Sequence, residues 1–277
     1  MKRSLAGWIL LLGLLLTTLS CSQSLRSKRI IIGSWRMASE QREVGNFSRI
    51  YFSGITSDLY VKTGSKTALC IKADDNILPY ITTKVVNGTL EFRTVPGVDL
   101  EPRRRAKYYV TVTNLDGIEA WGDGNVYASD LKSIKFSLTT ISGCYSFGTL
   151  TASEIVINPG GSGSSFTSNP SNLEIAGIYA EKLKVQNNSN SDIYVGKGKV
   201  GEQEVIISNE GSYKAPDLES TSAKLQMNGE GTATVWADKS LDAKFAAFSG
   251  DIYYRGDPAI TQDRQSDASG KLIKLRR

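Results

Sequence analysis

Turns centred on a small residue, usually glycine, recur through the second half of the chain at intervals close to 20 residues. Their central residues are Gly124, Gly143, Gly163, Ser191, Gly211, Gly231, Gly250 and Gly270. The successive intervals are 19, 20, 28, 20, 20, 19 and 20 residues, and only one of them departs from the spacing. An insertion near residues 175–182 would explain that long interval. A period of this length is typical of chains that stack short structural units on one another.

Strand-like segments lie between and after these turns. They are rich in β-branched and aromatic residues and partly alternate apolar with polar side chains, a pattern that favours strands. They comprise residues 134–138, 155–157, 183–185, 192–195, 205–207, 224–227, 234–236, 243–245 and 251–254. Several short strands per repeat predict a β-solenoid, in which each coil buries its inward side chains against its neighbours. A sandwich of hairpins is the alternative architecture, but the even spacing favours stacked coils.

The first half of the folded chain has the same β character. Its strand-like segments are residues 48–52, 58–62, 68–72, 89–92 and 108–112. Asn87-Gly88 is a hairpin sequence ahead of the fourth of these. We therefore predict an all-β fold, with a β-rich N-terminal capping region over residues 42–113 and solenoid repeats over residues 114–277. Residues 42–275 are expected to form one continuous folded unit, and only residues 39–44 could make a turn or two of helix.

The N-terminus has the pattern of an export signal. Two basic residues precede an apolar stretch at residues 6–16, which is shorter than the roughly 20 residues that cross a bilayer. Leu19-Ser20-Cys21 resembles a bacterial lipoprotein box, in which the cysteine becomes the lipidated first residue of the mature chain. We expect a lipoprotein signal peptide over residues 1–20, lipidation at Cys21 and a tether over residues 21–41. A membrane-anchoring helix is the alternative interpretation of the apolar stretch.

These features predict a cell-envelope location, with the membrane as a partner through the N-terminal lipid. Ser22 is compatible with sorting to the outer membrane, and the tether lacks the acidic run associated with surface export. An outer-membrane lipoprotein that faces the periplasm is therefore favoured over a surface-exposed one. An oxidising compartment permits a disulfide between Cys70 and Cys144, which the sequence neither requires nor excludes. Cys70 lies in an alternating apolar run and is expected to be a packed small hydrophobe.

Histidine is absent from the 277 residues, and this excludes whole classes of enzyme. Ser-His-Asp and Cys-His nucleophiles, His-ligated zinc and His-ligated haem all require it. Calcium binding through oxygen ligands is an alternative interpretation, because Asp116, Asp123 and Asp130 are evenly spaced and Asp192 and Asp251 occupy equivalent turn positions. The glycine-rich nonapeptide of calcium-binding β-rolls is missing, however, and aspartate commonly satisfies turn backbone by itself. We expect no metal, no cofactor and no catalytic residue.

Two sets of side chains are candidates for binding a ligand. Arg103, Arg104 and Arg105 form the densest charge run, although Pro102 beside them also suits a solvated connection between β-units. Exposed aromatic residues on one solenoid face would form a strip for stacking sugars or docking a protein, although the same residues also suit a buried core. The aromatic candidates are Trp121, Tyr145, Tyr194, Tyr213, Trp236 and Tyr253. No nucleic-acid recognition motif accompanies the basic run, so nucleic acid is not an expected partner.

Several motifs resemble the family of auto-transporter adhesins of the head GIN domain type, which is common among exported proteins of Bacteroidetes. The opening motif lies at residues 42–50, and further motifs lie at residues 73–78 and 87–90. The most specific is Ser249-Gly250-Asp251-Ile252-Tyr253-Tyr254-Arg255-Gly256-Asp257-Pro258. The resemblance covers about residues 42–275. It implies a right-handed parallel β-helix-like body behind an N-terminal β-region, and it brings no catalytic residues.

The repeats depart from the family pattern in places. Gly122-Asp123-Gly124, Gly161-Ser162-Gly163 and Gly229-Glu230-Gly231 keep paired glycines, whereas Ser191 replaces a central glycine. A tethered chain of this kind predicts a non-catalytic binding, adhesion or scaffold module in the envelope, with an envelope protein or glycan as its partner. The alternatives are a polysaccharide-active enzyme on a β-helix and a purely structural envelope protein.

Overall fold

The computed structural model describes residues 28–53, 56–160 and 170–276, and their regular structure is almost entirely strand. The one helical element among these described residues is a short 3-10 helix, Leu78–Tyr80. The strands of the N-terminal part are β1 (Arg29–Ile32), β2 (Met37–Arg42), β3 (Arg49–Ser53), β4 (Ser57–Thr63), β5 (Ala68–Asp74), β6 (Ile81–Val86), β7 (Thr89–Thr94), β8 (Val98–Glu101) and β9 (Ala106–Val112). The all-β prediction is confirmed.

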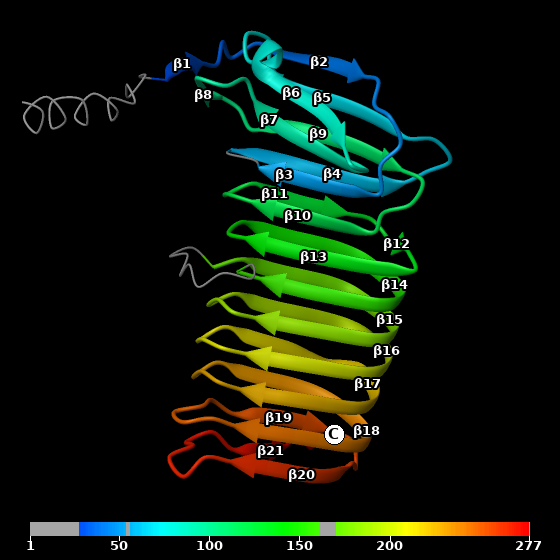
Figure 1. Cartoon of the computed structure of the whole chain (residues 1–277), viewed down its shortest axis with the longest axis vertical. Coiled ribbons are helices and arrows are strands. Elements are labelled where there is room, and N and C mark those ends of the chain that lie inside the picture. Colours follow the sequence, from blue (N-terminus) through cyan, green and yellow to red (C-terminus); the bar gives the residue numbers. More distant parts are fainter. Residues whose placement is uncertain (1–27, 54–55, 161–169, 277) are drawn as a thin grey trace, which may run out of the picture.

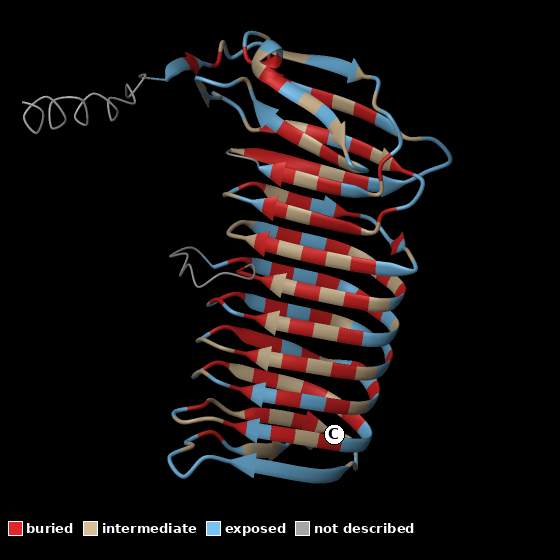
Figure 2. Ribbon diagram, viewed as in Figure 1, coloured by how far each residue is buried: buried red, intermediate tan, exposed pale blue. Residues whose placement is uncertain are grey.

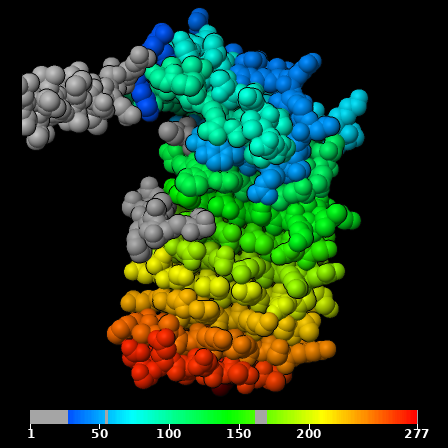
Figure 3. Space-filling model, viewed as in Figure 1, coloured from blue at the N-terminus to red at the C-terminus, as the bar shows by residue number. Residues whose placement is uncertain are grey.

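The rest of the described chain continues one large, mostly parallel sheet with long strands, to which β2–β7 and β9 also belong. Its strands are β10 (Gly117–Trp121), β11 (Asn125–Ala128), β12 (Leu131–Lys132), β13 (Lys135–Ile141), β14 (Cys144–Pro159), β15 (Asn172–Asn187), β16 (Asp192–Ile207), β17 (Ser212–Met227), β18 (Thr232–Phe245), β19 (Ile252–Arg255), β20 (Ala259–Arg264) and β21 (Leu272–Lys274). Strands that pair with each other lie one above another, and the chain advances along the long axis from β10 toward β20 and β21 (Figures 1 and 3).

The pairing register explains the 20-residue period of the sequence. In β15 and β16, Leu173 pairs with Ile193 and Val185 with Val205, so the two strands are offset by one repeat along their whole length. The inward row continues from Leu173 through Ile193, Tyr213, Ala233 and Ile252, each at most 1% exposed. Buried and exposed residues alternate along the strands (Figure 2), because successive side chains of a strand point to opposite faces. The inward side chains of each strand therefore pack against the inward side chains of its neighbours and form one continuous core.

The long interval in the repeat does not lie where the sequence placed it. Between β14 and β15 the offset is 28 residues from Cys144 opposite Asn172 to Ile157 opposite Val185. Residues 175–182, in contrast, follow the ordinary register to β16. The predicted insertion site is therefore wrong, and the extra residues lie between the end of β14 and the start of β15. The glycine pattern predicts Gly163 as the corner of this repeat, and Gly163 lies outside the described residues. The strand pairing instead places Ser171 at the position equivalent to Gly143.

The parallel stack begins earlier in the chain than the sequence indicated. β3 pairs in parallel with β10, and β4 pairs in parallel with β11. The predicted boundary between residues 113 and 114 therefore separates strands that are hydrogen-bonded to each other. Residues 29–32 and 37–41 fall inside the predicted tether, but they form β1 and all of β2 except its last residue. The helical turn expected at residues 39–44 is wrong, because β2 pairs antiparallel with β5.

The N-terminal strands build a β-rich layer on one end of the stack (Figure 1). β9 pairs in parallel with β4 and antiparallel with β5, which links this layer to the main sheet. β7 pairs in parallel with β3 and antiparallel with β6. The rings of Phe52 in β3, Phe92 in β7 and Tyr108 in β9 pack edge to face, with ring centroids 4.9–6.0 Å apart. Within residues 28–53, 56–160 and 170–276, no helix has the length and apolar character needed to cross a bilayer.

Candidate functional site

Three tyrosines stand side by side on the outer face of the sheet, on three strands that are distant in the sequence. Tyr60 of β4 lies between Tyr109 of β9 and Tyr127 of β11 in the register. The ring centroids are 5.0 Å apart for Tyr60 and Tyr109 and 5.1 Å apart for Tyr60 and Tyr127, and the rings are nearly parallel. Tyr109 is 41% exposed and Tyr127 is 38% exposed. We name these three residues the tyrosine row.

A groove of about 590 Å³ runs beside the tyrosine row. Its lining also includes the outward side chains of Gln41, Lys62, Cys70, Thr111, Ser129 and Ser146. Lys62 and Thr111 occupy paired positions on β4 and β9, two residues along each strand from the tyrosines. The groove therefore crosses the strands, with aromatic rings on one side and polar side chains on the other. We name this hollow the tyrosine groove.

The electrostatic surroundings of the tyrosine row are mainly positive. The Nζ atom of Lys107 lies 6.0 Å from the centroid of the Tyr60 ring, within the range of a cation–π contact. Asp58 lies on the same strand as Tyr60, but its carboxylate is occupied by Arg105 at 2.8 Å. Burial, and after it the charge of Asp58, raise the pKa of Tyr60 above its usual value. The Tyr60 hydroxyl is therefore protonated at neutral pH and can donate a hydrogen bond.

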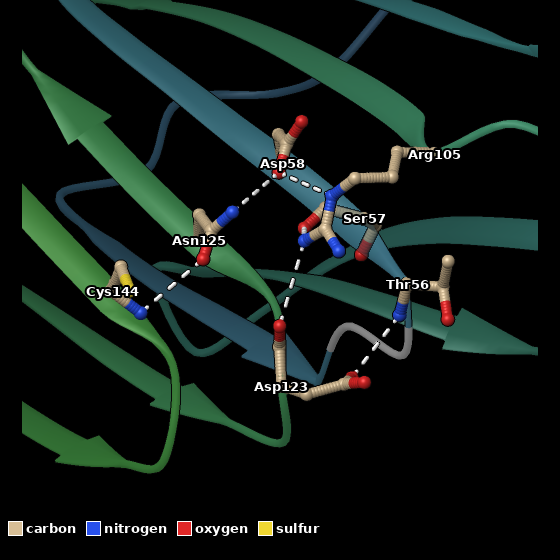
Figure 4. Close-up of polar contacts among 7 residues, drawn as sticks. All are labelled: Thr56, Ser57, Asp58, Arg105, Asp123, Asn125 and Cys144. Carbon is tan, nitrogen blue, oxygen red and sulfur yellow. Dashed lines mark hydrogen bonds and ion pairs between the residues drawn. The ribbon is translucent and has the colours of Figure 1, made fainter. Parts of the chain in front are cut away.

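A polar network fixes the strand ends next to the tyrosine row (Figure 4). Arg105 Nε donates to Asp58 Oδ1 at 2.8 Å, and Asn125 Nδ2 donates to the same oxygen at 3.0 Å. The Cys144 backbone N–H donates to Asn125 Oδ1 at 3.2 Å, which continues the network to the next strand. On the neighbouring turn, the Thr56 backbone N–H donates to Asp123 Oδ1 at 3.1 Å. The network ties β9, β4, β11 and β14 together at one edge.

The structure gives the three predicted basic residues different surroundings. Arg105 turns toward the sheet and pairs with Asp58. Arg103 and Arg104 are exposed in the turn between β8 and β9. The Arg103 backbone N–H donates to the Asp74 carboxylate at 3.0 Å. A role of the basic run in ligand binding stays a prediction. Arg105 also stabilises the fold through its ion pair with Asp58.

The six predicted aromatic residues do not form one strip. Tyr145 and Tyr213 are buried in the core. Trp121 and Tyr194 are exposed, whereas Trp236 and Tyr253 are half-buried. Tyr194 and Tyr253 do share the outward row that begins with the tyrosine row. Trp121 and Trp236 lie on other rows of the sheet.

The sequence did not single out the tyrosine row. Tyr60, Tyr109 and Tyr127 each lie at an outward position of a short alternating segment, which is a signal visible in the sequence. Their proximity depends on the pairing of β9 with β4 and of β4 with β11, between segments separated by roughly 50 and 70 residues. Nothing local in the sequence identifies those partners.

The other candidate residues have structural surroundings. Cys70 and Cys144 are both free cysteines, half-buried and exposed respectively, and Cys21 lies outside the described residues. Asp116 accepts from the Ser133 hydroxyl, and Asp130 accepts from the Thr149 backbone N–H at 2.6 Å. These aspartates stabilise turns. Among the residues that the structure describes, no group of three or more acidic or cysteine side chains is placed to hold a metal ion.

The motif at residues 73–78 fastens the N-terminal layer. Asp74 Oδ2 accepts from the backbone of the turn before β9. The Asp75 carboxylate accepts from the Ser34 hydroxyl at 2.5 Å, and Asn76 Nδ2 donates to the Ile32 carbonyl at 2.8 Å. Three consecutive polar residues thus hold the turn between β1 and β2 and the turn before β9 against β5.

Comparisons with solved structures show the same fold. A putative adhesin from Parabacteroides distasonis superposes with a TM-score of 0.78 at 19% identity, covering 89% of this chain and 100% of the other. A putative adhesin from Parabacteroides merdae gives 0.77 at 19% identity, covering 90% and 100%. A putative lipid binding protein from Parabacteroides distasonis gives 0.73 at 21% identity, covering 88% and 100%. No curated protein matches the chain in sequence.

The low sequence identities to these solved structures show the fold alone, and a match to a family model shows the family of the chain. The model described as "Putative auto-transporter adhesin, head GIN domain" matches residues 46–258, which is most of the chain. The matched region contains most of the motifs on which the resemblance in the sequence was based, from Asn46 to Pro258. The chain therefore belongs to the auto-transporter adhesin, head GIN domain family.

Proposed function

We propose that this protein is a cell-envelope lipoprotein that acts as a non-catalytic binding or adhesion module. The observation that carries the proposal is the tyrosine row with its groove on a large, continuous sheet. Exposed aromatic rings that line a hollow are typical of binding surfaces. Membership of an adhesin family supports the same role. A surface held by parallel strand pairing loses little further freedom when it binds a ligand.

The architecture that fits this role is a right-handed parallel β-helix capped by the N-terminal β-region, with residues 42–275 as one folded unit. The 20-residue offsets between β15, β16 and β17 support stacked coils. Right-handed connections between parallel strands are the general rule in proteins. The antiparallel strands β2 and β5 support a capping role, because they continue the sheet beyond the first parallel strands. An uncapped end would expose unpaired strand edges.

The location that we propose is the periplasmic face of the outer membrane, with the chain attached through lipidated Cys21. The basis is the export signal and lipoprotein box of the sequence. Several buried acyl chains, at about 0.8 kcal/mol per methylene, would hold the protein firmly on a membrane. A Cys21→Ser variant should lose palmitate labelling and leave the membrane fraction. Continued labelling and membrane retention of that variant would contradict the attachment.

The binding role is tested with the soluble chain that starts at Ser22. Immobilised protein is incubated with envelope proteins and envelope glycans, and the same protein is screened for cleavage of polysaccharides. The proposal expects specific retention of a component without cleavage. Reproducible cleavage that one Asp or Glu substitution abolishes would replace it with an enzyme, and absence of any retained component would favour a purely structural envelope protein.

A further inference from the structure

We infer that the tyrosine groove binds an acidic polysaccharide, a linear chain of sugar rings that carries carboxylate groups. The inference rests on the proposed binding function and gives it a site and a ligand class. The groove is lined along one side by Tyr60, Tyr109 and Tyr127 and along the other by Thr111, Lys62 and Ser129. Such a ligand needs apolar surfaces for its ring faces, hydroxyl partners, and cations for its carboxylates. The groove supplies all three.

The shape of the groove matches an extended polymer. The tyrosines occupy equivalent positions on β9, β4 and β11, so the groove follows the direction in which the strands stack. Neighbouring strands lie about 4.8 Å apart, a spacing comparable with the length of one sugar ring. Each strand therefore offers one tyrosine and one polar side chain to each successive ring. A small globular ligand would use only part of this repeating surface.

The tyrosine row provides the apolar contact and part of the hydrogen bonding. Its rings stack on one another and form a continuous aromatic wall. The carbon-bound hydrogens of a sugar would pack against the outer faces of the end rings, Tyr109 and Tyr127, and the phenol hydroxyls along the row would form hydrogen bonds with sugar hydroxyls. The raised pKa of Tyr60 keeps its hydroxyl protonated. On the opposite side, Thr111 and Ser129 add two further hydroxyls.

The charge around the groove favours an anionic ligand. Lys62 is exposed within the groove lining. Lys107 lies over Tyr60, and Lys72 is directly opposite Lys107 in the register of β5 and β9. Within the described part of the chain, none of these three lysines makes an ion pair. The nearby Asp58 carboxylate is paired with Arg105, although its negative charge still acts on Tyr60. The net charge of the side chains around the groove is therefore positive.

A single-stranded nucleic acid also combines negative charge with flat rings, but it fits this surface less well. Bases bind by stacking on open faces of aromatic side chains. In the tyrosine row the faces of Tyr60 are covered by Tyr109 and Tyr127. Bases would therefore have only the outer faces of the end rings, whereas a sugar chain would also form hydrogen bonds with the phenol, threonine and serine hydroxyls that line the groove.

The test measures binding of polygalacturonate and alginate to the soluble chain from Ser22 by isothermal titration calorimetry. Single-stranded DNA and neutral dextran serve as comparison ligands. We expect binding of at least one acidic polysaccharide that weakens as salt rises, because screening reduces the lysine contribution. Tyr60→Ala and Tyr127→Ala should each weaken binding about tenfold. Lys62→Gln, a change at an exposed position, should weaken binding and flatten its salt dependence.

Matched controls separate the groove from the rest of the surface. Tyr179→Ala removes an exposed tyrosine outside the groove, and Lys214→Gln removes an exposed lysine that is also outside the groove. Both should bind like the parent chain, and thermal melting should show that every variant is folded. Tighter binding of DNA than of either acidic polysaccharide, or equal losses in groove and control variants, would overturn the inference.

The same outcomes distinguish this inference from the proposed function. If both acidic polysaccharides fail to bind while the protein still retains an envelope component, the ligand assignment is wrong and the binding role stands. If the Tyr60→Ala and Lys62→Gln variants retain that component as the parent does, binding uses another surface. If the parent retains nothing, both proposals fail.

Discussion

Arg105 Nε donates to Asp58 Oδ1 at 2.8 Å and thereby joins the segment before β9 to the first residues of β4. The Asp58 side chain is only 9% exposed, whereas the Arg105 side chain is 38% exposed. The carboxylate therefore depends on this guanidinium and on Asn125 for its hydrogen bonds. The pair holds together two strands of the tyrosine row that are far apart in the sequence.

Replacing Arg105 should destabilise the protein. The Arg105→Gln variant leaves the nearly buried Asp58 carboxylate with fewer donors, and a deficit of this kind costs about 1–3 kcal/mol. Urea denaturation would measure the free energy of unfolding. Arg104→Gln, on the same turn but exposed, should change it by no more than about 0.5 kcal/mol. Equal stability of the two variants would contradict a structural role for the ion pair.

The corner glycines should tolerate no side chain. A Cβ atom at Gly231 would lie 2.0 Å from the Gly211 carbonyl oxygen on the neighbouring repeat. Gly231→Ala therefore forces the backbones apart and should cost about 1–3 kcal/mol or more. Gly45→Ala is the control, because no atom lies within 4 Å of a Cβ at that position. Thermal melting of both variants is the measurement, and a Gly231→Ala variant as stable as the parent would refute the close approach.

Alkaline pH should destabilise the fold through a buried tyrosine. Burial raises the pKa of Tyr108 from 10.0 to about 12. Between these values the unfolded chain has released the phenol proton and the folded chain has not, so stability is present below pH 10 and falls as pH rises. The loss from Tyr108 reaches on the order of 2–3 kcal/mol as the pH rises above 12. Burial likewise raises the pKa of Tyr145 and Tyr213, which steepens the fall.

The measurement for this prediction is urea denaturation at several pH values from 8 upward. Tyr108→Phe should reduce the slope above pH 10 by about 1.4 kcal/mol per pH unit. Tyr194→Phe changes an exposed tyrosine and should leave the slope as it is. A parent protein whose stability stays constant up to pH 12 would show that Tyr108 is not buried as described.

A buried amide inside the stack should contribute to stability. Gln203 Nε2 donates to Ser220 Oγ at 2.8 Å and to the Trp236 carbonyl at 3.1 Å, and the Tyr213 hydroxyl donates to Gln203 Oε1 at 3.2 Å. Gln203→Leu leaves the buried Tyr213 hydroxyl without its acceptor, whereas Ser220 still donates to the Trp236 carbonyl, and the change should cost about 1–3 kcal/mol. The exposed Gln226→Leu variant should cost less than about 0.5 kcal/mol. Chemical denaturation of both variants decides between these outcomes.

The sequence by itself determined the elements that depend on neighbouring residues. Segments such as residues 58–62 and 108–112 alternate inward and outward side chains, and the structure makes them β4 and β9. The 20-residue spacing of Ser191 and Gly211 reappears as the offset between β16 and β17, the strands that follow these two corners. Alternation and turn chemistry act within a few residues, so the chain shows them directly. The family motifs were also visible in the sequence.

The tertiary structure alone decided which strands meet. Gly163 resembled a corner, but strand register moved that corner to Ser171. Tyr60, Tyr109 and Tyr127 form one row because β9 pairs in parallel with β4, and β4 pairs in parallel with β11. Between β4 and β9 in the chain lies β5, which pairs antiparallel with β9. Strand pairing is chosen by the burial and hydrogen bonding of the whole sheet, and many registers suit the same local pattern. The predicted elements were therefore largely right, whereas the candidate binding surface required the distant pairing of strands.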